Sequence, residues 1–161
     1  MAKNSGSTRM TRPTQTRSSE YIQNVLHDLH TKSYSEQPPM RIANAERRML
    51  DYAHANNIEI SDAGLYLTSS AIAHAIRDTK QEKGITVPEK DLVSFPQNYK
   101  RMDLYYDTKK ETFVYTNNTV KFIVHPNYRI KIKRNKTKVV NFITASKTEG
   151  KEFKQKNYRK I

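Results

Sequence analysis

Residues 120–145, VKFIVHPNYRIKIKRNKTKVVNFITA, decide the fold, because apolar and polar side chains alternate along most of this stretch. In an extended chain, successive side chains point to opposite faces. Two sets of side chains therefore lie on opposite sides of residues 128–133: the apolar Tyr128, Ile130 and Ile132, and the cationic Arg129, Lys131 and Lys133. The segment 120–125 alternates in the same way and adds Lys121 and His125 to the cationic side. The pattern predicts strands with one buried face and one basic face.

The same pattern continues toward the N-terminus. Short segments rich in β-branched and aromatic residues are separated by turn residues, and they predict strands at 104–107, 112–115, 120–125, 128–133 and 138–145. Consecutive strands joined by short turns form a meander. Residues 101–146 are therefore predicted to form an antiparallel sheet of four to five strands.

The chain before the sheet is predicted to be helical. Apolar residues at helical spacing indicate helices at 20–31, 41–55 and 70–83, with one helical turn at 61–67 and a connector at 85–96. Helices followed by strands are typical of the α+β class, with the helices on one sheet face.

We therefore predict a single α+β domain over residues 20–161. It comprises a helical part at 20–96, the sheet part at 101–146, and a basic C-terminal segment at 147–161 that begins with a polar helix near 147–156. Residues 1–19 are rich in Ser, Thr and Arg and are predicted to be a disordered basic tail, because they cannot bury enough apolar surface to fold.

Composition excludes several kinds of site. The chain has no cysteine, and its five histidines form no ligand-type cluster, so we predict neither a metal nor another cofactor. No apolar run approaches the ~18 residues of a membrane span, and no signal peptide opens the chain. We expect a cytoplasmic protein without a membrane partner.

Positive charge is concentrated in the last quarter of the chain. The net charge is +13; residues 121–161 contribute +11, residues 1–19 contribute +4 and the intervening residues −2. Charge gathered on one structured segment is the electrostatic footprint of a protein that binds a polyanion. Nucleic acid, with RNA foremost, is the predicted partner. For any single cation the alternative is a solvated strand that lysine protects against edge pairing.

A second group of candidate residues lies on the helix predicted at 70–83. His74, Arg77 and Lys80 follow one another at i, i+3 spacing, and His74 lies roughly opposite the apolar stripe of Ile72 and Ile76. Metal-free RNA cleavage needs a group that titrates near neutral pH and fixed cations that stabilise the phosphorane. The alternative is a surface histidine without a catalytic role.

Tyrosine supplies a third signal. The chain has ten tyrosines and no tryptophan, and aromatic rings on a sheet can stack on unpaired bases. The tyrosines of the sheet region are Tyr105, Tyr106, Tyr115 and Tyr128. The alternative is that most of them are core residues with a hydrated hydroxyl.

The run from Ser69 to the C-terminus carries a resemblance in six pieces: SSAIAHAIRDTKQEKGITVPEKDL (69–92), SFP (94–96), YYD (105–107), FVYTNNTVKFIVHPNYRIK (113–131), VVNFITASK (139–147) and EFKQKNYRKI (152–161). They resemble phage-encoded nucleases of the barnase, EndoU, colicin and RelE superfamily. The resemblance implies a small α+β fold that cleaves RNA without metal, through a 2′,3′-cyclic phosphate. The positions that match the family's functional residues are His74, Arg77, Lys80, Lys121 and Thr144, with Tyr115 and Lys131 as weaker matches.

The leading hypothesis is a metal-independent endoribonuclease. In it the RNA 2′-OH attacks the adjacent phosphate, with His74 as general base or acid. Arg77, Lys80 and Lys121 would bind and stabilise the phosphate, while Thr144 would add a hydrogen bond. The residues predicted to bind the rest of the nucleic acid are Tyr115, Arg129, Lys131 and Lys133.

Two other functions fit the same charge. One is a non-catalytic protein of a phage or mobile element that binds or packages nucleic acid. The other is an assembly protein for an acidic protein partner. The resemblance adds a phage structural protein and an inhibitor as candidate partners, and the host cytoplasm or the virion as the place of action.

Overall fold

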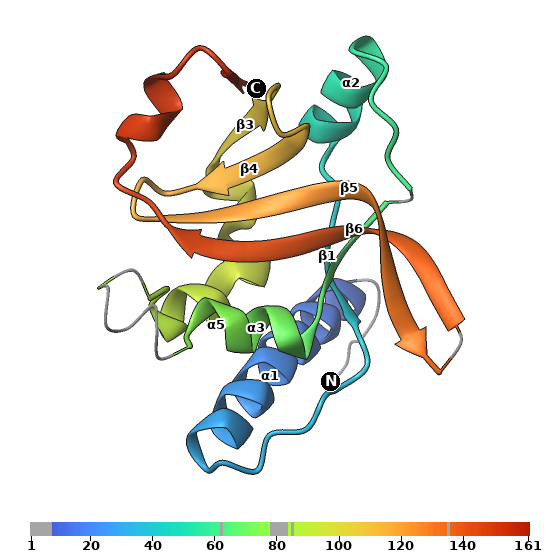
Figure 1. Ribbon diagram of the computed structural model, residues 1–161. Helices are drawn as coiled ribbons and strands as arrows, with labels where there is room; N and C mark the ends of the chain where they lie inside the picture. The colour runs from blue at the N-terminus through green and yellow to red at the C-terminus, as the bar shows by residue number, and fades with distance from the viewer. Residues whose placement is uncertain (1–7, 62, 78–83, 85, 135) are drawn as a thin grey trace.

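The computed structural model describes residues 8–61, 63–77, 84, 86–134 and 136–161, and in this part of the chain a seven-stranded sheet forms the centre of the molecule (Figure 1). The strands are β1 (Met40–Asn44), β2 (Gly64–Leu67), β3 (Asp103–Asp107), β4 (Thr112–Thr116), β5 (Val120–Lys133), β6 (Lys136–Lys147) and β7 (Tyr158–Lys160). Their order in the sheet is β1-β2-β6-β5-β4-β3-β7. Neighbouring strands are antiparallel except for the parallel pair β2 and β6.

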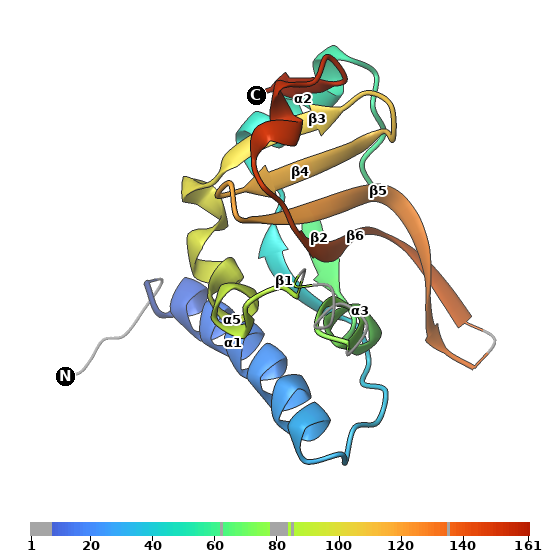
Figure 2. The same ribbon diagram turned by 60° about the vertical axis from the view of Figure 1, so that its left-hand side comes forward.

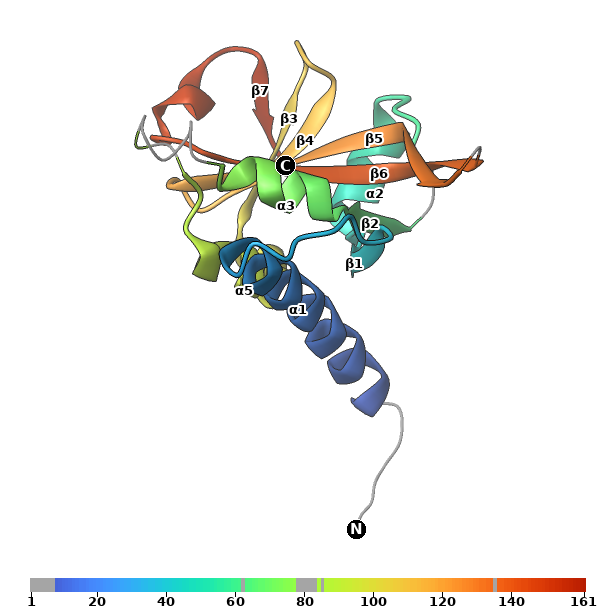
Figure 3. The ribbon, with the colours of Figure 1, turned by 60° about the horizontal axis from the view of Figure 1, so that its bottom comes forward.

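Helices cover one face of this sheet. In Figures 1 and 3, α1 (Thr8–His30), α3 (Ser69–Ala75) and α5 (Glu89–Asn98) lie together on that face. α3 begins where the Thr68 side chain accepts a hydrogen bond from the backbone N–H of Ala71, which is the usual N-cap arrangement. The remaining α-helix of the described part, α2 (Arg47–Ala55), packs Tyr52 against aromatic rings of β3 and β4.

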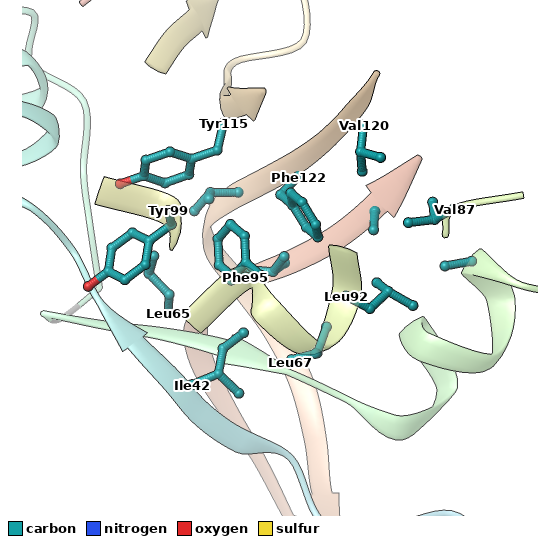
Figure 4. Close-up of a cluster of buried hydrophobic side chains, with 14 of the residues drawn as sticks. Ile42, Leu65, Leu67, Val87, Leu92, Phe95, Tyr99, Tyr115, Val120 and Phe122 are labelled. Carbon is teal, nitrogen blue, oxygen red and sulfur yellow. The ribbon is translucent and has the colours of Figure 1, made fainter. Parts of the chain in front are cut away.

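The core between α5 and the sheet is aromatic (Figure 4). The Phe95 ring of α5 lies 4.3 Å from the Phe122 ring of β5 and 5.9 Å from the Tyr115 ring of β4. All three side chains are essentially inaccessible to solvent. Full burial of one such ring stabilises the fold by about 1.5–3 kcal/mol, so this cluster fixes α5 on the sheet.

The predicted α+β class is confirmed, and the strands expected between 104 and 145 are present. Two of them, however, form one continuous strand, β5, in place of separate strands at 120–125 and 128–133. The register passes from His125 opposite Phe142 to Tyr128 opposite Val140, so two residues of β5 face one of β6. Pro126 and Asn127 therefore form a β-bulge, which bends a strand without ending it.

The strand count exceeds the predicted four to five because β1, β2 and β7 were not expected. The sequence predicts a helix from Arg41 and a helical turn at 61–67, yet Met40–Asn44 and Gly64–Leu67 are strands. Both segments bury apolar side chains, such as Ile42 and Leu65, in the common core. Short apolar runs do not reveal by their spacing whether they belong to a helix or a strand.

The predicted disorder of residues 1–19 is wrong for the part that the structure describes, since α1 begins at Thr8. Residues 1–7 lie outside the described part. Ser18 and Ser19 are buried, and Ser19 Oγ donates a hydrogen bond to the Val93 carbonyl at 3.0 Å. Contact with α5 thus supplies the stabilisation that the polar sequence of this segment lacks.

The segments around α3, α5 and the C-terminus also differ from the predicted structure. Most of the expected connector at 85–96 belongs to α5, which continues to Asn98. α3 ends at Ala75, well before the predicted residue 83, and residues 78–83 lie outside the described part. The polar helix expected near 147–156 is a single 3₁₀ turn, η2 (Lys151–Lys154), and a second 3₁₀ turn, η1 (Tyr99–Arg101), follows α5. After η2, β7 pairs with β3, so the basic C-terminal segment is part of the sheet.

Candidate nucleic-acid interface

The sheet has a second face, which we call the outer face because it points away from α1, α3 and α5. Along the first half of β5, Val120, Phe122 and Val124 are buried in the core. The alternate residues, Lys121, Ile123 and His125, pair with Ser146, Thr144 and Phe142 of β6. Lys121 and Thr144, two predicted site residues, therefore lie close together on the outer face, as the alternation predicts.

Lys121 is held by a carboxylate from the C-terminal segment. Its Nζ donates to Glu152 Oε2 at 2.8 Å. Glu152 also accepts hydrogen bonds from Thr148 Oγ1 at 2.5 Å and from the Tyr158 hydroxyl at 2.7 Å. Burial by itself would raise the pKa of Glu152, but these three donors hold that pKa below its usual value. Lys121 thus fastens η2 to the sheet, and a phosphate would have to compete with Glu152 for it.

This ion pair leads to a prediction about acid stability. Because the folded-state pKa of Glu152 lies below its unfolded value, its stabilisation is present above the unfolded pKa of about 4.5 and is lost as the pH falls through the folded pKa. We expect Lys121→Met to lower the unfolding free energy at pH 7 by about 1–2 kcal/mol. The variant should also lose less stability than the native protein as the pH falls from 5 to 3.

Urea unfolding across this pH range checks the prediction. Lys151→Met is the matched control, because the Lys151–Glu149 pair leaves both side chains more than three-quarters exposed; it should cause no measurable loss. Equal effects of the two substitutions would show that the Lys121–Glu152 contact has no special structural role.

Farther along the outer face, Thr144 contacts a histidine. Thr144 Oγ1 and His125 Nε2 are 3.0 Å apart. Burial, together with the charge of Lys110, lowers the pKa of His125. This shift favours the neutral form of the imidazole. Its ring centroid lies 5.7 Å from that of Tyr128 and 6.0 Å from that of Phe142, so it joins an aromatic cluster.

The histidine predicted to be catalytic lies elsewhere. His74 is exposed near the C-terminal end of α3, on the helix-covered side of the sheet, and Arg77 Nη1 lies 3.1 Å from its Nδ1. Because a guanidinium only donates, Nδ1 must accept this hydrogen bond. The structure thus brings His74 and Arg77 together but separates them from Lys121 and Thr144 by the thickness of the sheet. Lys80, the third cation of the group, lies outside the described residues.

The prediction that Tyr115 binds nucleic acid is wrong, because its side chain is buried. The ring packs edge-on against both Phe95 and Tyr99 in the core (Figure 4). Its hydroxyl donates to Glu46 Oε1 at 2.8 Å, and burial together with this carboxylate raises the pKa of the phenol. No base can reach a ring that is completely inaccessible to solvent.

The other three predicted contact residues lie on a projecting hairpin. Beyond the bulge, β5 and β6 turn away from the rest of the sheet (Figures 1 and 2). We call residues 128–140 the basic arm. Its six cations are all exposed: Arg129, Lys131, Lys133, Arg134, Lys136 and Lys138. The sequence contains no acidic residue from 126 to 148, and among the described residues no carboxylate forms an ion pair with the arm.

An open cleft of about 460 Å³ lies at the base of the basic arm. One wall consists of residues 128–132 and Phe142; the other consists of residues 36–39 together with Thr68 and Ser70 beside the start of α3. Tyr128 and Phe142 stack in this wall, with ring centroids 5.1 Å apart and an interplanar angle of 18°. The arrangement places aromatic rings and exposed cations next to each other.

The sequence patterns give Phe142 no role, and they place Tyr128 on the apolar side of its strand and among the four tyrosines of the sheet region. A usable signal was present: Tyr128 directly precedes the alternating cations, at a Pro-Asn step that marks a bend. Phe142 could not have been found in this way, because its contact with Tyr128 depends on the register of β6 against β5.

Within the described residues no cluster of three or more His, Asp or Glu is placed to hold a metal ion. In the same part of the chain, no helix combines the length and apolar character needed to cross a membrane. Comparisons with protein-family models, with curated proteins and with solved structures gave no match.

Proposed function

We propose that the protein binds nucleic acid, RNA foremost, through the basic arm. One observation carries this proposal: the arm presents six exposed cations, and among the described residues none of them forms an ion pair with a carboxylate. A lysine that only defends a strand edge needs no partner, but six cations on one projecting hairpin form a field that attracts a polyanion. Phosphate contacts then supply most of the affinity.

Fluorescence anisotropy of a labelled RNA over a range of salt concentrations tests this function. Binding should weaken steeply with salt, because each neutralised phosphate of a single strand contributes about 0.7 to the negative slope of log K against log salt concentration. An acidic protein as the true partner would leave RNA anisotropy unchanged, and that result would exclude the proposal.

RNA cleavage is a second candidate, supported by the contact between His74 and Arg77. An imidazole beside a permanent cation can move a proton next to a bound phosphate. Labelled RNA incubated with the protein in EDTA tests this activity. Cleavage that disappears in His74→Ala would support it, whereas intact RNA, or equal cleavage by the variant, would exclude the proposed role of His74.

The sequence resemblance to phage-encoded nucleases supports a place of action and further partners. We propose that the protein acts in the cytoplasm of a host cell or in association with a virion. A phage structural protein or an inhibitor would then be its protein partner. Purification of the protein from infected cells, followed by identification of the co-purifying chains, tests this assignment.

A further inference from the structure

Tyr128 is unusual among the large apolar side chains of the described residues, because 47% of it is exposed. One side of its ring stacks on Phe142. A tyrosine that only filled the core would bury most of its ring, and a tyrosine without a packing partner would move freely. Tyr128 is both exposed and supported, which is what a stacking platform requires.

The backbone around Tyr128 is also fixed. Asn127 adopts a φ of +54° in the bulge, a left-handed conformation that asparagine tolerates well. Its Nδ2 donates to Glu59 Oε2 at 2.9 Å. On the outer face the ring of His125 borders both Tyr128 and Phe142. The ring of Tyr128 is therefore oriented before any ligand arrives, so little side-chain entropy is lost on binding.

Two cations line the same cleft as this platform. They are Arg129 and Lys131, and both are exposed. Arg129 and Lys131 alternate with Tyr128 along β5 and point to the other face of the arm. A strand that crosses the edge of the arm at the cleft would therefore place a base on the ring and the adjacent phosphates on the cations. Glu36 also lines the cleft; as an acceptor it can bind a base edge but would repel a phosphate. The chemistry of the cleft thus suits a base, with the backbone on the arm side.

We propose that the cleft binds one unpaired base of a single-stranded nucleic acid, which stacks on Tyr128 while Arg129 and Lys131 contact the neighbouring phosphates. This inference rests on the proposed function and names its substrate class. In a duplex both faces of every internal base are already covered by neighbouring bases, so the platform has nothing to bind. The arm alone would hold duplex and single strand through phosphates; Tyr128 adds a preference for the single strand.

Substitutions of Tyr128 test the proposal on three labelled probes: a 12-nucleotide RNA, the DNA of the same sequence, and the RNA duplex. Tyr128→Leu should weaken single-strand binding by about 5- to 150-fold, which corresponds to the loss of one stacked base. Duplex affinity and the salt slope should stay the same. Tyr128→Phe keeps the ring and should bind like the native protein. Circular dichroism verifies that each variant is folded.

A fluorescent reporter gives an independent readout. The chain contains no tryptophan, so Tyr128→Trp introduces a single indole at the platform. Its emission should be quenched by the single strands and not by the duplex. Tyr52→Trp on α2, which does not line the cleft, is the matched control and should not respond. Equal quenching at both positions would overturn the proposal.

The outcomes separate this inference from the proposed function. If the native protein binds none of the probes, the proposed function itself fails. If binding is salt-dependent but Tyr128→Leu changes nothing, or weakens duplex and single strand equally, only the base-stacking site fails. A loss on both RNA and DNA identifies the base as the ligand, whereas a loss on RNA alone shows that the 2′-OH contributes; both support the site.

Discussion

Replacing Arg129, Lys131 and Lys133 together by glutamine should lower the affinity for a single-stranded RNA about 50-fold at 0.15 M salt and about 500-fold at 0.05 M. Three fewer phosphate contacts make the slope of log K against log salt concentration about 2 less steep. The difference between native and variant proteins must therefore grow as salt is removed. The three side chains are exposed, so the substitution should leave the stability of the fold nearly unchanged.

A matched variant shows whether position or only charge matters. Lys151, Lys154 and Lys156 are also exposed but lie in the C-terminal segment, away from the arm. Their replacement by glutamine removes the same net charge and should have a clearly smaller effect on affinity and slope. Equal losses from the two triple variants would contradict the arm as the interface, because long-range attraction by the whole molecule would then explain binding.

The alternation in residues 120–145 predicts β5 and β6, and it identifies the buried face correctly for the first half of β5. Beyond the bulge it fails at Tyr128, which it places on the buried face but which is 47% exposed and lies beside the ring of His125. A period of two is a property of the extended chain itself, and each buried residue of the first half of β5, such as Phe122, is flanked by residues of the outer face. The bulge was read as a turn for a physical reason: Pro126 and Asn127 favour both structures, and only the register against β6 distinguishes them.

The strands near residues 42 and 65, β1 and β2, could not be predicted from the local sequence pattern. Ile42 and Leu65 become buried because β1 pairs with β2, and β2 with β6, which lies about 75 residues further along the chain. Local spacing holds no information about such distant partners. Sequence also places His74 and Arg77 together correctly, because they are only three residues apart, although α3 ends at Ala75 and Arg77 lies beyond it. Local spacing could not tell which face of the sheet this helix covers.

Substitutions of Tyr115 test whether its ring belongs to the core or to a nucleic-acid interface. If its ring belongs to the core, Tyr115→Ala should lower the unfolding free energy by about 3–5 kcal/mol, the usual effect of removing a large buried aromatic ring. Tyr115→Phe keeps the ring and loses only the hydrogen bond to Glu46. Since Arg48 Nε still donates to Glu46 Oε1 at 3.1 Å, this variant should lose only about 1–2 kcal/mol.

Urea unfolding of both variants measures these losses of stability. RNA binding, measured at a temperature where each variant is folded, shows whether Tyr115 also contacts nucleic acid. Affinity should stay within about twofold of the native value, because a stacking loss of ~1–3 kcal/mol would be far larger. For Tyr128→Leu the same two measurements should give the opposite result: the variant keeps its stability and loses affinity for RNA. A Tyr115→Ala protein of native stability and weakened RNA binding would restore Tyr115 to the interface and would refute its place in the core.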